Sequence, residues 1–196
     1  MASKSLPTIT LDQYIAFDNE AERRGEYLNG HMVEVEAATR NHSAIVANLA
    51  REVGLSLKES ACRVYTQDLR VYMPAANECA YPDLVITCGR EDFAPGSILL
   101  NPLALIAVLS PSTEHYDRGT KFAHYRSIPS LREYITIAQD KFEIQQWSVI
   151  GHEASVSLAG KWLLNATLTD RTDNLAFASL PLNIPFLEIY RNVFWE

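Results

Sequence analysis

The chain has 196 residues, a length that fits one domain with a sizeable core, and its 47% hydrophobic and 21% charged residues are the composition of an ordinary globular protein. A net charge of -7 argues against broad non-specific binding to nucleic acid, so any contact with nucleic acid requires a local basic patch. No apolar run approaches the ~20 residues of a membrane helix, and the first seven residues lack a secretory apolar core. We therefore expect one soluble domain, residues 1–196, in the cytoplasm.

The cysteines give no sign of a metal or redox motif. Cys62, Cys79 and Cys88 lack the paired spacing of zinc or thioredoxin-like sites, and an odd count fits a reducing compartment. We expect all three to be buried thiols that pack as small hydrophobic side chains.

The N-terminal third predicts a helix, a hairpin and a longer helix. Thr10 and Gln13 have the spacing of a capping box before a short helix that ends near residue 20. Asn29-Gly30 then separates two strand-like segments, as in a tight β-hairpin. Hydrophobic residues recur at helical spacing over residues 41–58, which predicts the longest helix.

Strands dominate the remainder of the chain. The strand candidates are residues 63–73, 83–87, 103–109, 133–137 and 142–147, with a weaker signal at residues 161–169. Two of them, 83–87 and 103–109, are continuously apolar, as in strands covered on both faces. A second helix is predicted over residues 116–127, after a Ser-Pro-Ser-Thr break. This mixture predicts an α+β fold with a mixed central sheet flanked by helices.

Segments spread along the chain carry a resemblance to a known family. They are Glu26-Tyr27-Leu28-Asn29-Gly30, Asn41-His42, Asp68-Leu69-Arg70-Val71, Tyr81-Pro82-Asp83, Val108-Leu109-Ser110-Pro111-Ser112-Thr113, Tyr116-Asp117-Arg118-Gly119-Thr120-Lys121-Phe122, His124-Tyr125-Arg126 and Leu131-Arg132-Glu133-Tyr134. Together they resemble the successive signatures of the Uma-two family, restriction-endonuclease-like proteins of the PD-(D/E)xK nuclease superfamily that are common in cyanobacteria. The resemblance implies a restriction-endonuclease-like core and metal-dependent hydrolysis of DNA phosphodiesters.

The resemblance also implies roles for particular residues. Asp83 would be the central metal-binding aspartate, Glu26 an upstream acid and Lys121 the lysine of the motif. The main-chain carbonyl of Val108 would give a further oxygen to Mg²⁺ or Mn²⁺. The family's usual residue at position 107 is glutamate, whereas this chain has Ala107, whose methyl group binds no metal. An endonuclease with a weakly held metal and impaired activity is therefore implied.

Three further residues are candidates for binding the DNA. His42 lies near the start of the long predicted helix, where it either hydrogen-bonds to the cleft or caps the helix. Arg70 and Arg118 belong to a set of arginines that forms either the required basic patch or a solvated face balanced by acids. The other members of this set are Arg63, Arg126 and Arg132. Because cutting both strands calls for two sites, the resemblance also implies a homodimer.

The candidate acids and the lysine have ordinary structural interpretations as well. Asp83 can cap a turn, and Glu26 can face solvent beside the hairpin. Asp117 and Lys121 are four residues apart on a predicted helix and can form an exposed ion pair. Asp68 would replace the missing acid if it pointed into the same cleft.

Two main classes of function follow from the sequence. The first is a Mg²⁺-dependent DNA endonuclease, and the second is a module on an inactivated nuclease fold that binds nucleic acid or protein. Hydrolysis of another phosphoester is a remote third. The position of Ala107 relative to Asp83 and Lys121 decides whether a missing-ligand account is tenable.

Overall fold

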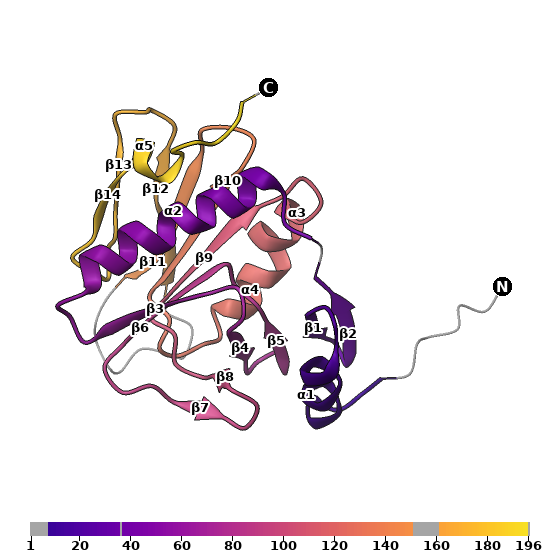
Figure 1. Ribbon diagram of the computed structural model, residues 1–196. Coiled ribbons are helices and arrows are strands. Elements are labelled where there is room, and N and C mark those ends of the chain that lie inside the picture. Colours follow the sequence, from indigo (N-terminus) through magenta and orange to yellow (C-terminus); the bar gives the residue numbers. More distant parts are fainter. Residues whose placement is uncertain (1–7, 36, 151–160, 196) are drawn as a thin grey trace.

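The computed structural model describes residues 8–35, 37–150 and 161–195, and its α+β fold confirms the fold class predicted from the sequence (Figure 1). The central sheet is formed by β3 (Cys62–Thr66), β6 (Leu84–Cys88), β9 (Ala104–Leu109), β10 (Glu133–Ala138), β11 (Ile144–Ile150) and β12 (Lys161–Leu168). Their order across the sheet is β12-β11-β10-β9-β6-β3. β9 and β10 are parallel, and the other neighbouring pairs are antiparallel.

A second sheet carries the N-terminal hairpin. Its strands are β1 (Gly25–Leu28), β2 (His31–Glu34), β4 (Arg70–Met73), β5 (Glu78–Ala80), β7 (Phe93–Ala94) and β8 (Ile98–Leu99), in the order β2-β1-β5-β4-β8-β7. The predicted turn at Asn29-Gly30 joins β1 to β2, and both residues have positive φ, 51° and 78°. Such a turn matches the twist of the two strands. The pairing of β1 with β5 brings the hairpin to the middle of the chain.

Two capped helices begin where the sequence predicts them. α1 (Leu11–Glu20) starts with the Thr10–Gln13 capping box, in which each side chain binds the other residue's backbone N–H. α2 (Arg40–Leu57) is the longest helix, and the Thr39 hydroxyl accepts the backbone N–H of His42 at 3.1 Å. α2 lies across one face of the central sheet (Figure 1). His42 is therefore held in the first turn of this helix.

The second predicted helix is interrupted by a wider turn. It consists of α3 (Glu114–Tyr116), a π-helical turn at Asp117–Lys121 and α4 (Phe122–Tyr125). Such single π turns recur at functional sites, because they change which side chains point inward. Here the turn contains both Asp117 and Lys121, and it leads into α4, whose Phe122 and Tyr125 belong to the hydrophobic cluster on the other side of the central sheet from α2.

The C-terminal elements had no counterpart in the sequence prediction. β13 (Asn174–Ala176) pairs with β14 (Asn183–Pro185), and α5 (Phe186–Ile189) follows. The fully buried Glu133 anchors this unit, because its carboxylate accepts the backbone N–H groups of Ala178 and Ser179 at 3.0 and 3.1 Å. These charge-assisted hydrogen bonds fix short strands that have little periodicity of their own.

The last residues are also tied to the start of α2. The side chain of Asn41 donates to the carbonyl of Phe194 at 2.8 Å and accepts its backbone N–H at 3.1 Å. The guanidinium of Arg40 lies over the Phe194 ring at 3.5 Å. The C-terminal segment therefore contacts the same helical turn that presents His42.

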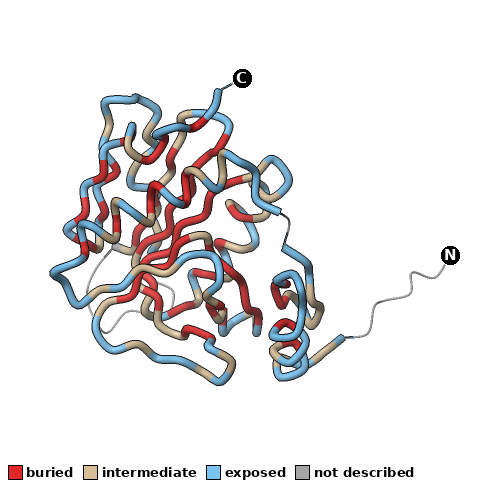
Figure 2. Tube along the Cα trace, in the orientation of Figure 1, coloured by how far each residue is buried: buried red, intermediate tan, exposed pale blue. Residues whose placement is uncertain are grey.

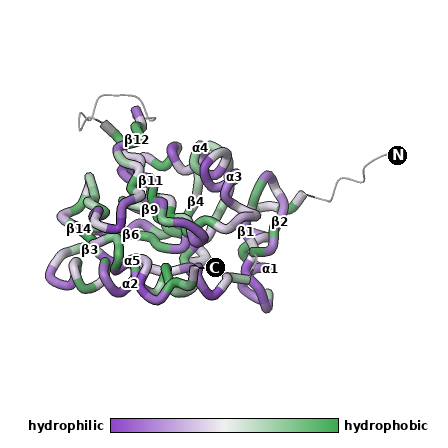
Figure 3. Tube along the Cα trace, turned by 90° about the horizontal axis from the view of Figure 1, so that it is seen from above, coloured by the Kyte–Doolittle hydropathy of each residue, from purple (hydrophilic) through white to green (hydrophobic). Residues whose placement is uncertain are grey.

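The central sheet separates two hydrophobic clusters. α2, α5 and the β13–β14 unit cover one face, with Leu49 and Ile106 fully buried between them. α4 covers the other face, where Phe122 stacks on Tyr134 at 4.8 Å. Figure 2 shows the buried residues running through the central strands, and Figure 3 shows hydrophobic residues gathered there while α2 alternates in hydropathy. β9 is buried along its whole length, as its apolar run predicts.

One predicted strand is wrong in its extent. The candidate over residues 63–73 is divided into β3 and β4, which belong to different sheets. Gln67, with φ of 35°, turns the chain between them, and its N–H donates to the carbonyl of Asp83 at 3.2 Å. The segment on which the cytoplasmic prediction depends, residues 1–7, lies outside the described residues. None of the described helices is long and apolar enough to cross a membrane.

The prediction of three free thiols is also wrong. Cys62 and Cys88 are directly opposed on β3 and β6 and form a disulfide. Their pairing depends on the strand register, which joins residues 26 positions apart. Cys79 is a free, buried thiol, and burial raises its pKa to about 12. Only Cys79 therefore behaves as the sequence predicts.

The disulfide gives a direct prediction. In the unreduced, denatured protein, a thiol reagent should titrate Cys79 alone, and reduction should release two further thiols. Replacing both Cys62 and Cys88 with alanine should lower the free energy of unfolding by about 3 kcal/mol, because the unfolded chain loses a cross-link. Chemical denaturation measures this change. Three titratable thiols without reduction would contradict the cross-link.

Candidate functional site

Asp83 is held between two elements that are distant in sequence. It immediately precedes β6, and its Oδ2 accepts the backbone N–H of Val108 on β9 at 2.7 Å. Its Oδ1 lies 3.0 Å from Nε2 of His42 at the start of α2. The Asp83 carboxylate thus links β9 to α2 instead of capping its own turn. The imidazole of His42 therefore contacts Asp83, while the backbone N–H of His42 takes part in the helix cap.

Ala107 lies opposite Asp83. Val85 pairs with Leu105, and Leu84 pairs with Ile106, so the next step of this register places Ala107 across from Asp83. On its other side Ala107 pairs with Thr136 of β10. The Thr136 hydroxyl is buried and has no hydrogen-bond partner among the described residues. A longer acidic side chain at position 107 would extend over the same face as Asp83, beside this hydroxyl.

Lys121 forms a buried ion-pair cluster with two acids. Its Nζ lies 2.7 Å from Oε1 of Glu26 and 3.6 Å from Oδ1 of Asp117. Glu26 also accepts the backbone N–H of Tyr81 at 3.0 Å. The side chains of Lys121 and Glu26 are each 11% exposed, and that of Asp117 is 8% exposed. The interpretations of Glu26 as solvent-facing and of Asp117–Lys121 as a surface pair are therefore wrong.

Burial and neighbouring charges determine how this cluster ionises. Burial lowers the pKa of Lys121, but the charges of Glu26 and Asp117 and the hydrogen bond to Glu26 outweigh it and raise the pKa above its usual value. Lys121 is therefore a cation at neutral pH. For Asp117 burial is the largest influence and raises the pKa, although the charge of Lys121 opposes it.

The buried Tyr125 hydroxyl is influenced by the charges of three carboxylates. Burial raises its pKa, and the charges of Glu26, Asp117 and Asp83 raise it further, in that order. The Tyr125 hydroxyl is buried and has no hydrogen-bond partner in the described part of the chain. Each of these acids must lie near Tyr125 to act on it. Lys121 is paired with Glu26, and Glu26 binds the backbone N–H of Tyr81, two residues before Asp83, so the predicted aspartate, glutamate and lysine lie in one region.

Arg70 and Arg118, the two arginines predicted to bind DNA, are paired with acids of the protein. Arg70 is buried in a pair with Asp18, with Nη2 2.5 Å from Oδ2, and its other donors bind Asn19 and the carbonyl of Gly96. Arg118 contacts Glu114 at 2.9 Å and Glu143 at 2.5 Å. The remaining arginines of the set are engaged as follows: Arg63 pairs with Glu91, Arg126 lies over the Phe122 ring, and Arg132 donates to main-chain carbonyls.

Two acids are placed differently from their sequence interpretation. Asp68 does not replace the missing acid, because its side chain is 77% exposed and pairs with Arg24. Asp117 lies in the cluster, although the sequence gives it only the spacing of a helical ion pair. That spacing, in a segment that also carries Lys121, was the available signal. What it could not reveal was burial, which depends on the π turn.

The residues present do not fit a tightly held metal ion. Position 107 provides no carboxylate, both oxygens of Asp83 already contact His42 and Val108, and Glu26 is paired with Lys121. Val108 presents its backbone N–H to Asp83. Among the described residues, no three His, Cys, Asp or Glu side chains are grouped so that they could hold a metal.

A family profile and two relatives show which proteins this chain is similar to. The profile of the Uma2 family, described as "Putative restriction endonuclease", matches residues 11–178. Two uncharacterized Synechocystis proteins are similar to this chain. One, sll1609, is 25% identical over 167 residues, which are 84% of this chain and 90% of the relative. The other, slr1290, is 28% identical over 192 residues, which are 97% of this chain and 96% of the relative.

A solved structure shows the fold. It is described as "a putative nuclease belonging to DUF820" from Anabaena variabilis, and its TM-score to this chain is 0.72 at 15% sequence identity. The match covers 95% of this chain and 99% of the other. The restriction-endonuclease-like fold predicted from the sequence is thus confirmed. Because the family profile extends over most of the sequence, this chain belongs to the Uma2 family of restriction-endonuclease-like proteins.

Proposed function

We propose that this protein is a DNA endonuclease with an impaired active site, in which Ala107 replaces the second acidic ligand. The observation that carries the proposal is the position of Ala107 across from Asp83, on the face where Lys121 and its acids gather. Family membership and fold support phosphodiester chemistry as the ancestral activity. The substrate, DNA, is part of the proposal.

The chain's own residues would act mainly by orienting a phosphate. Lys121, a buried cation, would neutralise charge on the phosphate, but only after weakening its contact with Glu26. His42 and the Val108 N–H hold the Asp83 carboxylate in one orientation. Preorganised contacts of this kind contribute to catalysis because they need little rearrangement during the reaction.

We assign only weak binding of Mg²⁺ or Mn²⁺ to this site. Asp83 and the main-chain carbonyl of Val108 are the candidate ligands, and a bound divalent ion supplies Lewis-acid activation in nucleases. With so few protein oxygens available, water and substrate would have to complete the coordination shell. We also propose that the chain is a single domain that acts in the cytoplasm. A homodimer is part of the proposal, because two sites are needed to cut two strands.

Nicking of supercoiled plasmid in Mg²⁺ or Mn²⁺ tests the proposal. The natural chain should convert plasmid slowly to the open-circular form, and Asp83→Asn should abolish that conversion. Glu34→Gln is the matched control, because it also removes one negative charge, from an exposed acid outside the cluster. Equal nicking by the natural and Asp83→Asn proteins would point to a contaminant and refute the assignment.

The alternative is a module on an inactivated nuclease fold. One observation favours it: the short contact between Lys121 and Glu26 leaves the lysine committed to a protein carboxylate. In that case the natural chain would bind a labelled DNA duplex or a protein partner without nicking plasmid at any metal concentration. Binding that is unaffected by Asp83→Asn would support the module over the endonuclease.

A further inference from the structure

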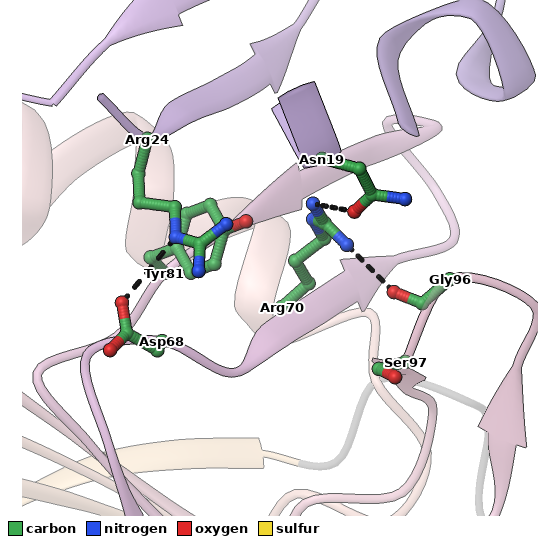
Figure 4. A pocket seen from close by; sticks show the side chains of 7 residues that line it. All are labelled: Asn19, Arg24, Asp68, Arg70, Tyr81, Gly96 and Ser97. Atoms are coloured by element: carbon green, nitrogen blue, oxygen red, sulfur yellow. Dashed lines mark hydrogen bonds and ion pairs between the residues drawn. The ribbon is translucent and has the colours of Figure 1, made fainter. Parts of the chain in front are cut away.

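A cavity is lined by residues outside the Lys121 cluster (Figure 4). Its volume is about 280 Å³, close to the lower end of the range for small-molecule sites. Its walls include Asn19, Arg24, Asp68, Arg70, Tyr81 and Ser97. These residues come from the end of α1, the segment before β1, the β3–β4 turn, β4, the segment before β6 and the β7–β8 turn. The cavity is predominantly polar in character.

Arg70, in the wall of this cavity, is held by several hydrogen bonds, and its charge is balanced by Asp18. Arg70 binds the fully buried Asp18 through Nε at 2.9 Å and Nη2 at 2.5 Å. Its Nη1 donates to the carbonyl of Gly96 at 2.7 Å. The Tyr81 hydroxyl donates to the same Asp18 carboxylate. Arg70 is thus a positioning residue, and its charge is already neutralised.

Arg24 is the cation available to a ligand in this cavity. Its only ionic partner in the described chain is Asp68, with Nε 3.4 Å from Oδ1, and the two side chains are 46% and 77% exposed. Such an exposed, long pair is weak. Neither terminal nitrogen of Arg24 has a hydrogen-bond partner among the described residues, and Figure 4 shows the guanidinium beside the Tyr81 ring. Four N–H donors are therefore uncommitted.

Two neutral donors face the same space. The Asn19 carbonyl oxygen accepts from Arg70, which leaves the Asn19 amide nitrogen as a donor with no partner in the described part of the chain. The Ser97 hydroxyl likewise has no such partner. Ser97 has φ of 56° and follows Gly96 with φ of 80°, so two left-handed residues hold the turn in place. A guanidinium, an amide and a hydroxyl together match the oxygens of a phosphate.

The cavity is coupled to the candidate site through two short segments. Tyr81 lines the cavity with its ring, while its backbone N–H binds Glu26 of the Lys121 cluster. Arg24 precedes Glu26 by two residues. The segment that carries Arg24 is thus also the one that carries Glu26, the partner of Lys121.

We propose that this cavity is a phosphate-binding subsite that takes a backbone phosphate of DNA next to the one at Lys121, with Asp68 as the anion that the phosphate displaces from Arg24. The inference rests on the proposed function for its ligand, DNA. The same chemistry would also admit free inorganic phosphate, which the experiment distinguishes.

Fluorescence anisotropy with a labelled DNA duplex tests the subsite. Arg24→Gln should weaken binding about tenfold and lower the slope of log affinity against log salt by about 1, because one phosphate contact is lost. Asp68→Asn should tighten binding several-fold, because the competing carboxylate is gone. The matched controls are Arg23→Gln and Glu34→Gln, which change the adjacent exposed pair, 2.7 Å apart, outside the cavity. Both controls should stay within about twofold of the natural chain.

Inorganic phosphate tests whether the cavity takes a backbone phosphate of DNA or free phosphate. It is added as a competitor in the anisotropy assay and is titrated separately by calorimetry. Displacement of DNA by phosphate in the natural chain, but not in Arg24→Gln, supports a backbone subsite. Equal DNA affinities of Arg24→Gln and Arg23→Gln overturn the subsite but leave the proposed function intact. If the natural chain binds phosphate but no DNA, the cavity is an anion site and the proposed function fails. Binding of neither ligand refutes both.

Discussion

Ala107→Glu is expected to raise metal-dependent nicking of plasmid DNA by about 100-fold or more, since a directly coordinating carboxylate stabilises metal and transition state by several kcal/mol. The register of β6 and β9 places the new side chain across from Asp83. Thr136 lies beside it on β10, and its buried hydroxyl is available to hydrogen-bond the carboxylate. Initial rates of nicking in Mg²⁺ and Mn²⁺ measure the effect.

Two control variants separate ligation from simple changes in size and charge. Ala107→Gln has nearly the same volume as Ala107→Glu but lacks the charge, so it should remain as slow as the natural chain. Adding Asp83→Asn to Ala107→Glu should remove the gain, because both acids are needed to hold the ion. If Ala107→Glu is no faster than Ala107→Gln, the missing-ligand account is wrong.

Thermal stability provides a second readout for the same variant. The introduced glutamate would add a carboxylate close to Asp83, Glu26 and Asp117, so the metal-free variant should melt below the natural chain. Mg²⁺ or Mn²⁺ should then raise its melting temperature, because an ion that binds only the folded state stabilises it. The natural chain should respond weakly. A variant that unfolds without metal and is not rescued by it would contradict the restored site.

Arg70→Met is expected to lower the free energy of unfolding by about 3–5 kcal/mol, because it leaves Asp18 buried without its cation. The side chains of Arg70 and Asp18 are 6% and 0% exposed, so solvent cannot replace the lost contact. For a protein of this size the loss corresponds to a fall in melting temperature of about 6–20 °C. Denaturant unfolding measures the change. Arg63→Met, which breaks a pair with Glu91 in which the arginine is 61% exposed, should change stability by no more than about 1 kcal/mol.

The pH dependence gives an independent check on this pair. Burial raises the pKa of Asp18, but hydrogen bonds from Tyr81, Gly25 and Arg70 outweigh it and hold the pKa below its usual value. A lowered acid pKa contributes stability that is present above the unfolded value, near pH 4, and is lost as pH falls through the folded value. The stability gap between the natural chain and Asp18→Asn should therefore be widest near neutral pH and narrow below about pH 4. A gap independent of pH would argue against an ionised Asp18.

Local signals predicted much of the fold. The capping box before α1, the Asn29-Gly30 turn and the helical spacing in α2 act within a few residues, and each element appears where its signal lies. The apolar runs of β6 and β9 likewise mark strands buried on both faces. These elements could be predicted because neighbouring residues largely determine them.

Long-range contacts determine the parts that the sequence did not reveal. β3 and β4 read as one strand because Gln67 carries no strong turn signal, yet they belong to different sheets. The pairing of Cys62 with Cys88 requires the β3–β6 register. β13 is short, and its position depends on the carboxylate of Glu133, which is distant in sequence. None of these features has a periodicity that a sequence pattern can display.

The candidate site, too, could be predicted from the sequence only in part. The sequence identified Asp83, Glu26 and Lys121, and the structure brings them to one region, while their catalytic roles stay predictions. It did not identify the burial of Asp117, because that depends on a π turn. Arg70 was expected at the DNA, but its partner Asp18 lies on α1, far away along the chain. Charge partners from distant segments cannot be read from spacing.

The contact between Asn41 and Phe194 has a practical consequence for handling the protein. A purification tag fused after the final residue would emerge beside the first turn of α2, within a few residues of the imidazole that binds Asp83. Such an extension can disturb DNA cleavage measurements without altering any residue of the site. Assays should therefore use protein whose carboxyl terminus carries no added sequence.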